Sequence, residues 1–363
     1  MPKRLLLDIG PIAGGHGARG IGSYVRGLIQ AVEEWPAERQ QQVWALTVPG
    51  VTPGLFEGRT VQPRLLGLRP VDLGWILGSS VMGRAARTAG ADLVHSTDPH
   101  RPARLPAVRQ VVTAYDLIPL LEPGVLNSWQ PHHRHAYRLY LEQLRRADVV
   151  IAISRATVAD LVERLGIPES RTSIVYPVIR APLVAGRTPV PEPTFLYVGA
   201  LDAHKQPGLA IGALAEFRRA HAGGSLRLVG PSTSEQRTRL RRQVESLGLS
   251  GNVSFEGRVS DEKLDEAFAT ATALLVTSRI EGFGLPGVEA VLRGLPVVAV
   301  DTAAARETLG SAAVLVPPDA GAIAEAMASP QPVPDSVRNA MASRFSSRAA
   351  ADALWAAYER AFG

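Results

Sequence analysis

Ser278-Arg-Ile-Glu-Gly-Phe-Gly-Leu-Pro-Gly-Val-Glu289 decides the fold of this 363-residue chain. The apolar run 273–277 before it predicts a buried strand, and residues 288–293 after it predict the start of a helix that ends at Gly294. A glycine-rich turn between a strand and a helix presents backbone N–H groups to an anion. Glu281 and Glu289 lie on either side of this turn.

The two carboxylates predict what kind of ligand the turn holds. A carboxylate repels phosphate but accepts hydrogen bonds from hydroxyls, so one ligand with both a phosphate and sugar hydroxyls fits this stretch. The alternative is a simple helix cap with two surface acids. Four helix breakers are more than a cap needs, and this favours the binding site: Gly282, Gly284, Pro286 and Gly287.

Working outward, strands alternate with helices through both halves of the chain, which predicts an α/β fold with buried parallel strands. The predicted strands are residues 4–10, 42–48, 91–97, 110–117, 148–153, 173–176, 194–199, 225–230, 253–256, 273–277, 296–301 and 312–316. The predicted helices are residues 23–32, 72–89, 131–146, 156–165, 209–217, 235–247, 262–269, 288–293 and 349–362. Residues 182–193 are rich in proline and show no periodicity, so they predict a linker between two domains.

A second glycine-rich loop, residues 14–22, lies between the first strand and the first helix. Gly22 or Ser23 could cap that helix, whose apolar face is predicted to carry Val25, Leu28, Ile29 and Val32. The loop resembles a phosphate-binding loop without matching GxGxxG, so a plain surface loop remains the alternative.

Polar residues follow several predicted strands, where ligands of open parallel sheets bind. In the first half these residues are His95, Asp98, Tyr115 and Asp116, although His95 could equally be a hydrogen-bonded core residue. In the second half, Lys205 follows a strand and suits a diphosphate, with a surface lysine as the alternative.

The helix predicted over residues 131–146 combines an apolar side of Leu139, Leu141 and Leu144 with a basic face. Its histidines do not predict a metal site, because His132 and His133 do not share a helix face and no acid lies nearby. The basic face could meet an acidic acceptor or lipid headgroups.

Composition excludes several classes of function. Net charge is only +5, from 39 basic and 34 acidic residues. The sequence has no basic stripe with interleaved aromatic residues, so it does not predict nucleic-acid binding. There is no cysteine, which rules out disulfides and cysteine-ligated metals. No apolar run approaches the ~18 residues of a membrane span. We expect a cytoplasmic protein, with peripheral contact at the inner membrane face left open.

Residues 276–299 closely resemble the Glu-x7-Glu signature of the family-4 retaining glycosyltransferases, which have the GT-B fold. Four further stretches occupy family-like places in order: residues 19–24, 112–119, 147–154 and 197–205. The resemblance implies two Rossmann-like domains that face each other across a cleft. These are an acceptor-binding domain over residues 1–185 and a nucleotide-sugar-binding domain over residues 186–345. A C-terminal helix, residues 346–363, is expected to cross back onto the first domain.

The resemblance also implies residue roles. Glu289 matches the residue that binds the ribose hydroxyls, Glu281 the one that contacts the transferred sugar, and Lys205 the one that neutralises the leaving diphosphate. The backbone of the glycine turn, at Phe283, Gly284 and Leu285, would meet the sugar and the diphosphate. The loop of the first domain, at Gly15, His16 and Gly17, would approach the diphosphate. Arg258 and Val259 would lie against the base.

The implied reaction moves a mannose-like or glucose-like hexose from a nucleotide-diphosphate sugar, of the guanosine or uridine type, to an acceptor hydroxyl. Front-face attack would retain the anomeric configuration, without metal or cofactor. The acceptor could be a saccharide, a lipid-linked saccharide or a small natural product. The stretches 20–24 and 116–119 look like those of mannosyl- and rhamnosyl-transferring relatives, which favours guanosine diphosphate mannose as donor.

Two positions depart from the family pattern. Ala200 stands where many members have Arg, and Tyr115 where many have a sugar-contacting His; Tyr115 and Asp116 are the candidates for that role here. A tyrosine donates a hydrogen bond but carries no positive charge. The alternative is therefore a relative that binds a sugar nucleotide without transferring it, or that couples a cyclitol. An epimerase or a phosphorylase is a third hypothesis, but no pyridoxal-binding lysine region is apparent.

Overall fold

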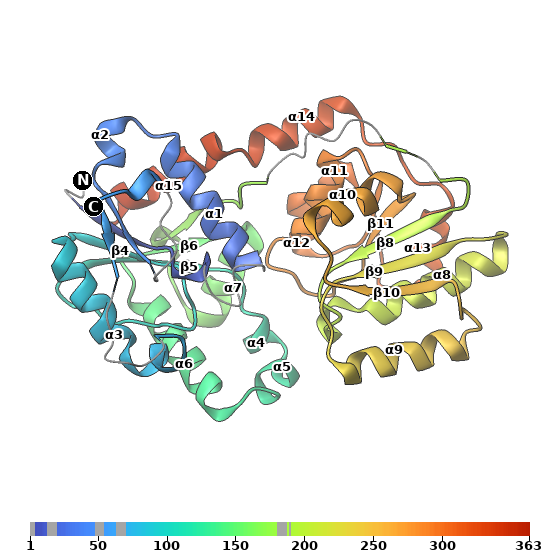
Figure 1. Cartoon of the computed structure of the whole chain (residues 1–363), viewed down its shortest axis with the longest axis horizontal. Coiled ribbons are helices and arrows are strands. Elements are labelled where there is room, and N and C mark those ends of the chain that lie inside the picture. Colours follow the sequence, from blue (N-terminus) through green and yellow to red (C-terminus); the bar gives the residue numbers. More distant parts are fainter. Residues whose placement is uncertain (1–3, 13–19, 48–53, 63–69, 180–186, 189) are drawn as a thin grey trace. The chain divides into compact units, whose positions relative to one another are not determined.

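The computed structural model describes residues 4–12, 20–47, 54–62, 70–179, 187–188 and 190–363. The chain divides into two compact units (Figure 1). Unit 1 consists of Met1–Val178 with Phe345–Gly363, and unit 2 of Ile179–Arg344. Each unit is a parallel sheet covered by helices, as the alternation of strands and helices predicts.

The sheet of unit 1 has the strand order β3-β2-β1-β4-β5-β6-β7, with every neighbouring pair parallel. Its central strands are buried on both faces, which is why β6 is wholly apolar and β1 is apolar up to Asp8, while β4 also buries His95 and Ser96. The strands are β1 (Leu5–Asp8), β2 (Val43–Leu46), β3 (Thr60–Val61), β4 (Leu93–Ser96), β5 (Arg109–Ala114), β6 (Val149–Ala152) and β7 (Thr172–Ile174).

Helices cover this sheet on both sides. One face of the sheet carries Leu6, Val94, Val112 and Val150. On this face Leu6 and Val94 pack against α3 (Pro70–Ala89), and Val112 and Val150 pack against α6 (Pro131–Arg146) and α7 (Arg155–Leu165). α1 (Gly20–Glu33) and α15 (Ser347–Arg360) lie side by side on the opposite face (Figure 1). The shorter helices of the unit are α2 (Ala37–Gln40), α4 (Ile118–Leu121), α5 (Pro123–Asn127) and the 3-10 turns η1 (Gly10–Ile12), η2 (Gly54–Phe56) and η3 (Glu169–Arg171).

The C-terminal helix belongs to unit 1, which confirms that it returns to the first domain. The indole nitrogen of Trp35 donates to the carbonyl of Ala351 at 3.0 Å, and its ring meets Trp355 edge-on at 5.1 Å. Tyr358 reaches through to His95, whose ring nitrogens lie 2.8 Å from the hydroxyls of Tyr358 and Thr113. Polar partners buried at this depth fix how α15 docks.

Unit 2 repeats the architecture with the strand order β10-β9-β8-β11-β12-β13. One face packs on α8, α9 and α13, and α10 and α11 contact the other (Figure 1). The strands are β8 (Thr194–Val198), β9 (Ser225–Val229), β10 (Val253–Gly257), β11 (Ala273–Val276), β12 (Val297–Val300) and β13 (Val314–Val316). The helices are α8 (Pro207–Ala220), α9 (Ser234–Ser246), α10 (Asp261–Thr270), α11 (Leu285–Leu292), α12 (Ala303–Thr308), α13 (Ala320–Ala328) and α14 (Asp335–Arg344), with η4 (Ala203–Lys205) and η5 (Gly310–Ala312).

Three local predictions were wrong. α1 begins at Gly20, so neither Gly22 nor Ser23 caps it. α11 begins at Leu285 rather than 288, because Pro286 falls in the first turn, where a missing N–H costs nothing. Leu139 is exposed, and Tyr137 and Tyr140 fill the buried side of α6 instead.

Gly230 allows two loops to cross at the carboxyl ends of β8 and β9. Its φ is +144°, and a Cβ there would overlap the carbonyl oxygen of Gly199. We expect Gly230→Ala to lower the free energy of unfolding by about 2 kcal/mol or more, since both backbone strain and overlap must be relieved. Gly248 is the control: its φ is +69° but nothing lies near its Cβ position. Urea unfolding should show a clearly larger loss for Gly230→Ala than for Gly248→Ala; equal losses would contradict the crossing.

Candidate active site

The candidate site lies where the strand order of unit 2 reverses. β8 pairs with β9 on one side and with β11 on the other, so the loops that leave β8 and β11 part at the carboxyl edge of the sheet. Such a point is where doubly wound sheets bind ligands. Lys205 follows β8 and Glu281 follows β11, so both predicted residues stand at this point.

Lys205 and Glu281 are in direct contact. The Lys205 Nζ lies 2.7 Å from Glu281 Oε1, and the hydroxyl of Ser278 donates to the same oxygen at 2.6 Å. Both charged side chains are partly accessible, with 23% and 15% of their surface exposed. The pair is therefore held in place yet open to a ligand.

The charge state of Glu281 follows from its neighbours. Burial raises the pKa of this carboxyl, but the charge of Lys205 and the hydrogen bonds from Lys205 and Ser278 outweigh burial and bring the pKa below its ordinary value. Glu281 is therefore an anion at neutral pH. An ionised carboxylate accepts hydrogen bonds from hydroxyls and interacts favourably with positive charge nearby.

The glycine-rich turn is fixed from both ends. Gly284 has φ +86°, a conformation that glycine tolerates, and it directly precedes the first residue of α11. Thr308 of α12 donates to the carbonyl of Phe283 at 3.1 Å, and Phe283 is only 2% exposed. The amino end of α11, from Leu285 onward, thus starts beside the Lys205–Glu281 pair, in the geometry that stabilises anions.

Glu289 lies in the second turn of α11 and its carboxylate has no hydrogen-bond partner among the described residues. Burial raises the pKa of Glu289 above its ordinary value, and nearby Arg293 only partly offsets this. The Arg293 guanidinium instead binds Asp265, at 2.6 Å. A half-buried carboxylate with vacant acceptors can bind ligand hydroxyls.

The other predicted residues are more scattered. Arg258 and Val259 follow β10, two strands from β8 at the same edge, with Arg258 exposed. Gly15, His16 and Gly17 lie outside the described residues.

In unit 1 the residues that follow β4 and β5 serve local structure. The Tyr115 hydroxyl donates to the carbonyl of Thr97 at 2.8 Å, and Asp116 accepts from the backbone N–H of Ile118 at 3.0 Å. His95 is fully buried and bonded at both nitrogens, so it is the core residue of the two alternatives. Burial lowers the pKa of His95 to about 3, so it is neutral.

Asp8, at the end of β1, gives unit 1 a pH dependence. It is fully buried, Oδ1 accepts from the Gly10 N–H at 2.9 Å, and Oδ2 has no partner among the described residues. Burial raises its pKa to about 6, with Arg101 opposing and Asp98 adding to the shift. The proton therefore binds the folded state more tightly, and this contribution to stability is complete below pH 3.8 and lost as pH rises through about 6.

Asp8→Asn should therefore gain stability relative to the wild type as pH rises. We expect the difference in unfolding free energy between variant and wild type to move in the variant's favour by about 1–3 kcal/mol between pH 4 and pH 7.5. Denaturant unfolding at both pH values measures this. A difference that does not change with pH would show that the Asp8 carboxyl is not held in the buried environment described here.

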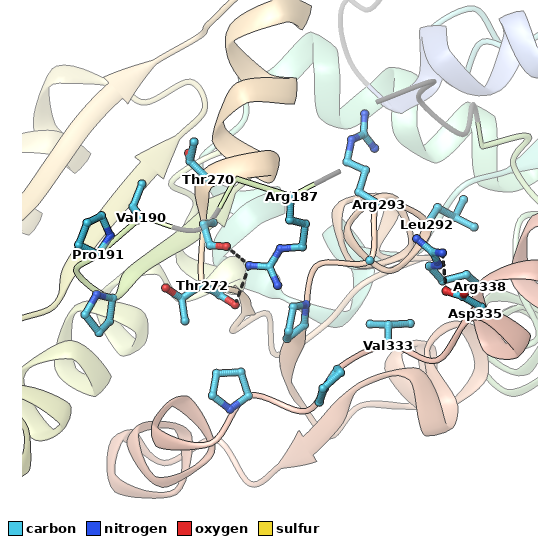
Figure 2. A pocket seen from close by; sticks show the side chains of 16 residues that line it. Arg187, Val190, Pro191, Thr270, Thr272, Leu292, Arg293, Val333, Asp335 and Arg338 are labelled. Carbon is cyan, nitrogen blue, oxygen red and sulfur yellow. Dashed lines mark hydrogen bonds and ion pairs between the residues drawn. The ribbon is translucent and has the colours of Figure 1, made fainter. Parts of the chain in front are cut away.

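A separate pocket, of about 570 Å³, lies at the amino-terminal edge of the unit 2 sheet (Figure 2). Arg187 reaches the carbonyls of Ala271 and Thr272 there, and Arg338 pairs with Asp335 (Figure 2). It includes none of the predicted site residues. In the described part of the chain no group of three or more acidic or histidine side chains could hold a metal ion, and no helix is long and apolar enough to span a bilayer.

Two family matches cover most of the chain. Residues 18–181 match the family described as Glycosyltransferase Family 4, and residues 185–331 match Glycosyl transferases group 1. Each of the two matches is to a glycosyltransferase domain. The fold of the chain is GT-B, with two Rossmann-like sheets of seven and six strands.

Curated relatives of these glycosyltransferase domains match over shorter stretches. A D-inositol 3-phosphate glycosyltransferase of Acidothermus cellulolyticus is 37% identical over 118 residues, which is 31% of this chain and 26% of the relative. A mannosylfructose-phosphate synthase of Agrobacterium fabrum is 30% identical over 172 residues, 42% of this chain and 38% of the relative. The chain thus spans about a quarter to two fifths of the length of these relatives.

Solved structures show the same GT-B fold over the whole chain. A sucrose-phosphate synthase from Thermosynechococcus elongatus has a TM-score of 0.73 at 22% identity and covers 99% of both chains. Anabaena HepE in complex with UDP has a TM-score of 0.62 at 20% identity and covers 99% of this chain and 95% of its own.

Sequence reasoning assigned no role to Ser278 or Thr308, although both hold the glycine turn. Ser278 lies within the motif and could have been examined as a hydrogen-bond donor to Glu281, three residues on. Nothing in the sequence connects Thr308 with Phe283, which is 25 residues away.

Proposed function

We propose that the chain is a retaining hexosyltransferase that uses a nucleotide-diphosphate sugar. The observation that carries the proposal is the Lys205–Glu281 contact of 2.7 Å at the switch point of unit 2, beside the amino end of α11. This arrangement offers a cation for a diphosphate, a carboxylate for sugar hydroxyls and backbone N–H groups for both. In the proposal, residues 186–345 bind the donor and residues 1–185 the acceptor.

The charges determine the proposed chemistry. When the anomeric C–O bond breaks, negative charge collects on the leaving diphosphate and positive charge on the sugar. The negative charge on the diphosphate would be stabilised by Lys205 and by the N–H groups of Phe283, Gly284 and Leu285. The positive charge on the sugar would be stabilised by the ionised carboxylate of Glu281. The acceptor hydroxyl attacks on the face that the diphosphate leaves, and its proton passes to a leaving phosphate oxygen. Products are a glycoside of unchanged configuration and a nucleoside diphosphate.

No metal is required in this proposal, since Lys205 and the amino end of α11 supply the positive charge that the diphosphate needs. Glu289, with vacant acceptors, binds the ribose hydroxyls, and Arg258 and Val259 lie against the base. Gly15, His16 and Gly17 remain the proposed contact of the first domain with the diphosphate.

Guanosine diphosphate mannose is the favoured donor. Two relatives are named mannosyltransferases, RfbU of Salmonella typhimurium and WbdA of Escherichia coli. A uridine donor is the second candidate, because the solved HepE contains UDP. For the acceptor, a saccharide, a lipid-linked saccharide and a small natural product all fit the proposal. It places the reaction in the cytoplasm, with the exposed basic face of α6 available for peripheral contact with the inner membrane face.

A non-transferring relative, or one that couples a cyclitol, is the second candidate. One observation favours it: the Tyr115 hydroxyl, which stands where many members have a sugar-contacting histidine, is already bonded to the carbonyl of Thr97. Asp116 would then be the polar group nearest in sequence that could contact the sugar.

A panel of nucleotide sugars separates the two candidates. The purified protein is incubated with each donor and an acceptor extract, nucleoside diphosphate release is measured, and donor affinity is determined by calorimetry. The proposal predicts release that depends on the acceptor for at least one donor. Tight binding without turnover across the panel would establish the second candidate instead.

A further inference from the structure

Thr277 ties the strand that carries Glu281 to the loop that carries Lys205. It directly follows β11, is 1% exposed, and its hydroxyl lies 2.9 Å from the carbonyl oxygens of both Lys205 and Gln206. β11 is itself paired with β8 and β12, so the hydroxyl sits on a rigid element. One buried donor therefore serves two consecutive carbonyls of the neighbouring loop.

The loop that Thr277 holds is strained. Gln206 has a φ of +49°, and no other non-glycine residue in the described part of the chain has a positive φ. Such a conformation costs about 1 kcal/mol or more and persists only where the surroundings impose it. Pro207, which follows, opens α8 and has no N–H to contribute. The Thr277 hydroxyl has a single proton, so its two contacts form one bifurcated hydrogen bond, which ties this strained backbone to the end of β11.

The residues after Thr277 continue the same connection. The N–H of Arg279 donates to the carbonyl of His204 at 2.9 Å, and Ser278 and Lys205 share one oxygen of Glu281. Glu281 orients the end of the Lys205 side chain, whereas Thr277 fixes its main chain. The distance from Lys205 Nζ to a diphosphate depends on both.

We infer that Thr277 is a positioning residue of the donor site, which aims Lys205 at the diphosphate of the nucleotide sugar. The inference rests on the proposed function and extends it to a residue that contacts no substrate. Because Thr277 acts through Lys205, its removal should affect recognition of the second phosphate and leave recognition of the nucleoside unchanged.

The test compares two ligands that differ by one phosphate. Calorimetry gives the dissociation constants of GDP and GMP, with UDP and UMP in parallel, for the wild type, Thr277→Val, Thr277→Ser, Lys205→Ala and the double variant Thr277→Val/Lys205→Ala. We expect Thr277→Val to reduce the preference for diphosphate over monophosphate about tenfold, as the loss of one well-aligned charged hydrogen bond does. Thr277→Ser, which keeps the hydroxyl, should restore the preference.

The double variant separates positioning from general destabilisation. If Thr277 acts through Lys205, Thr277→Val causes no further loss of the preference in the Lys205→Ala background. Thr272→Val is the matched control: Thr272 lies just before β11, and its hydroxyl accepts from the N–H of Thr194 at 3.0 Å, away from the turn. This variant should lose stability without any change in the preference.

Three outcomes would overturn the inference: an unchanged preference in Thr277→Val, an equal loss of affinity for both nucleotides, or losses that add in the double variant. If the wild type prefers the diphosphate and the variants give any of these three outcomes, the inference about Thr277 is wrong but the proposed function still stands. A wild type that binds neither nucleotide, or both equally, overturns the proposed function and the inference with it.

Discussion

Glu281→Gln is expected to lower the rate of sugar transfer by about 100- to 1,000-fold. The change keeps the shape of the side chain and removes its negative charge. In the structure this charge faces Lys205 at 2.7 Å and is maintained by Ser278. The neutral amide would no longer favour the positive charge that develops on the transferred sugar. Nucleotide affinity should change by no more than about twofold, because the amide oxygen of glutamine still accepts from Lys205 and keeps its ammonium group in place for the diphosphate.

The measurement is initial-rate kinetics with the donor that the panel identifies, together with calorimetry of the nucleoside diphosphate. Glu256→Gln is the matched control, since Glu256 is also paired with a cation, Arg227 at 2.6 Å, but on β10 rather than at the turn. Full activity in Glu281→Gln would show that the site is assigned to the wrong residue.

Glu289→Ala should act on binding rather than on chemistry. The Glu289 carboxylate is half-buried and has no hydrogen-bond partner within the described residues, so its acceptors are available to a pair of ribose hydroxyls. Removing them should weaken nucleotide binding by about 10- to 100-fold. The maximal rate at saturating donor should fall much less.

Deoxynucleotides sharpen this second experiment. If Glu289 binds the ribose, the wild type should bind the 2′-deoxynucleoside diphosphate more weakly than the ribonucleotide, and Glu289→Ala should bind both alike. Glu262→Ala, on the neighbouring helix α10, controls for loss of surface charge. A variant that still discriminates against the deoxynucleotide would place the ribose elsewhere.

The order of elements in the fold was predictable because the strands are short apolar runs and the helices amphipathic. The helix predicted over residues 72–89 is present as α3, although it contains three glycines. Packing of its buried face outweighs the low helix propensity of glycine. Where α11 begins was less predictable. Pro286 looked like a breaker before the helix, but in the first turn it is compatible with one.

Long-range contacts limited the prediction of the site. Lys205 and Glu281 were each recognisable, but their contact spans 76 residues of sequence and depends on β8 lying next to β11. Thr277 is separated from Lys205 by 72 residues, and a threonine after a strand carries no signal of its own. The hydrogen bond from the Tyr115 hydroxyl to the carbonyl oxygen of Thr97 likewise depends on the direction of the tyrosine side chain, which the sequence does not specify. Helices α12, α13 and α14 were also missed, although the buried residues of α13, Ile323, Ala324 and Met327, do follow a helical spacing.

The stereochemistry of transfer tests the central claim most directly. A donor labelled with ¹³C at the anomeric carbon is followed by NMR in a reaction with acceptor, while the released nucleoside diphosphate is measured. We predict one equivalent of nucleoside diphosphate for each glycoside formed, with the anomeric configuration of the donor retained in the product. A product of inverted configuration, or no glycoside with any donor that binds, would contradict the account.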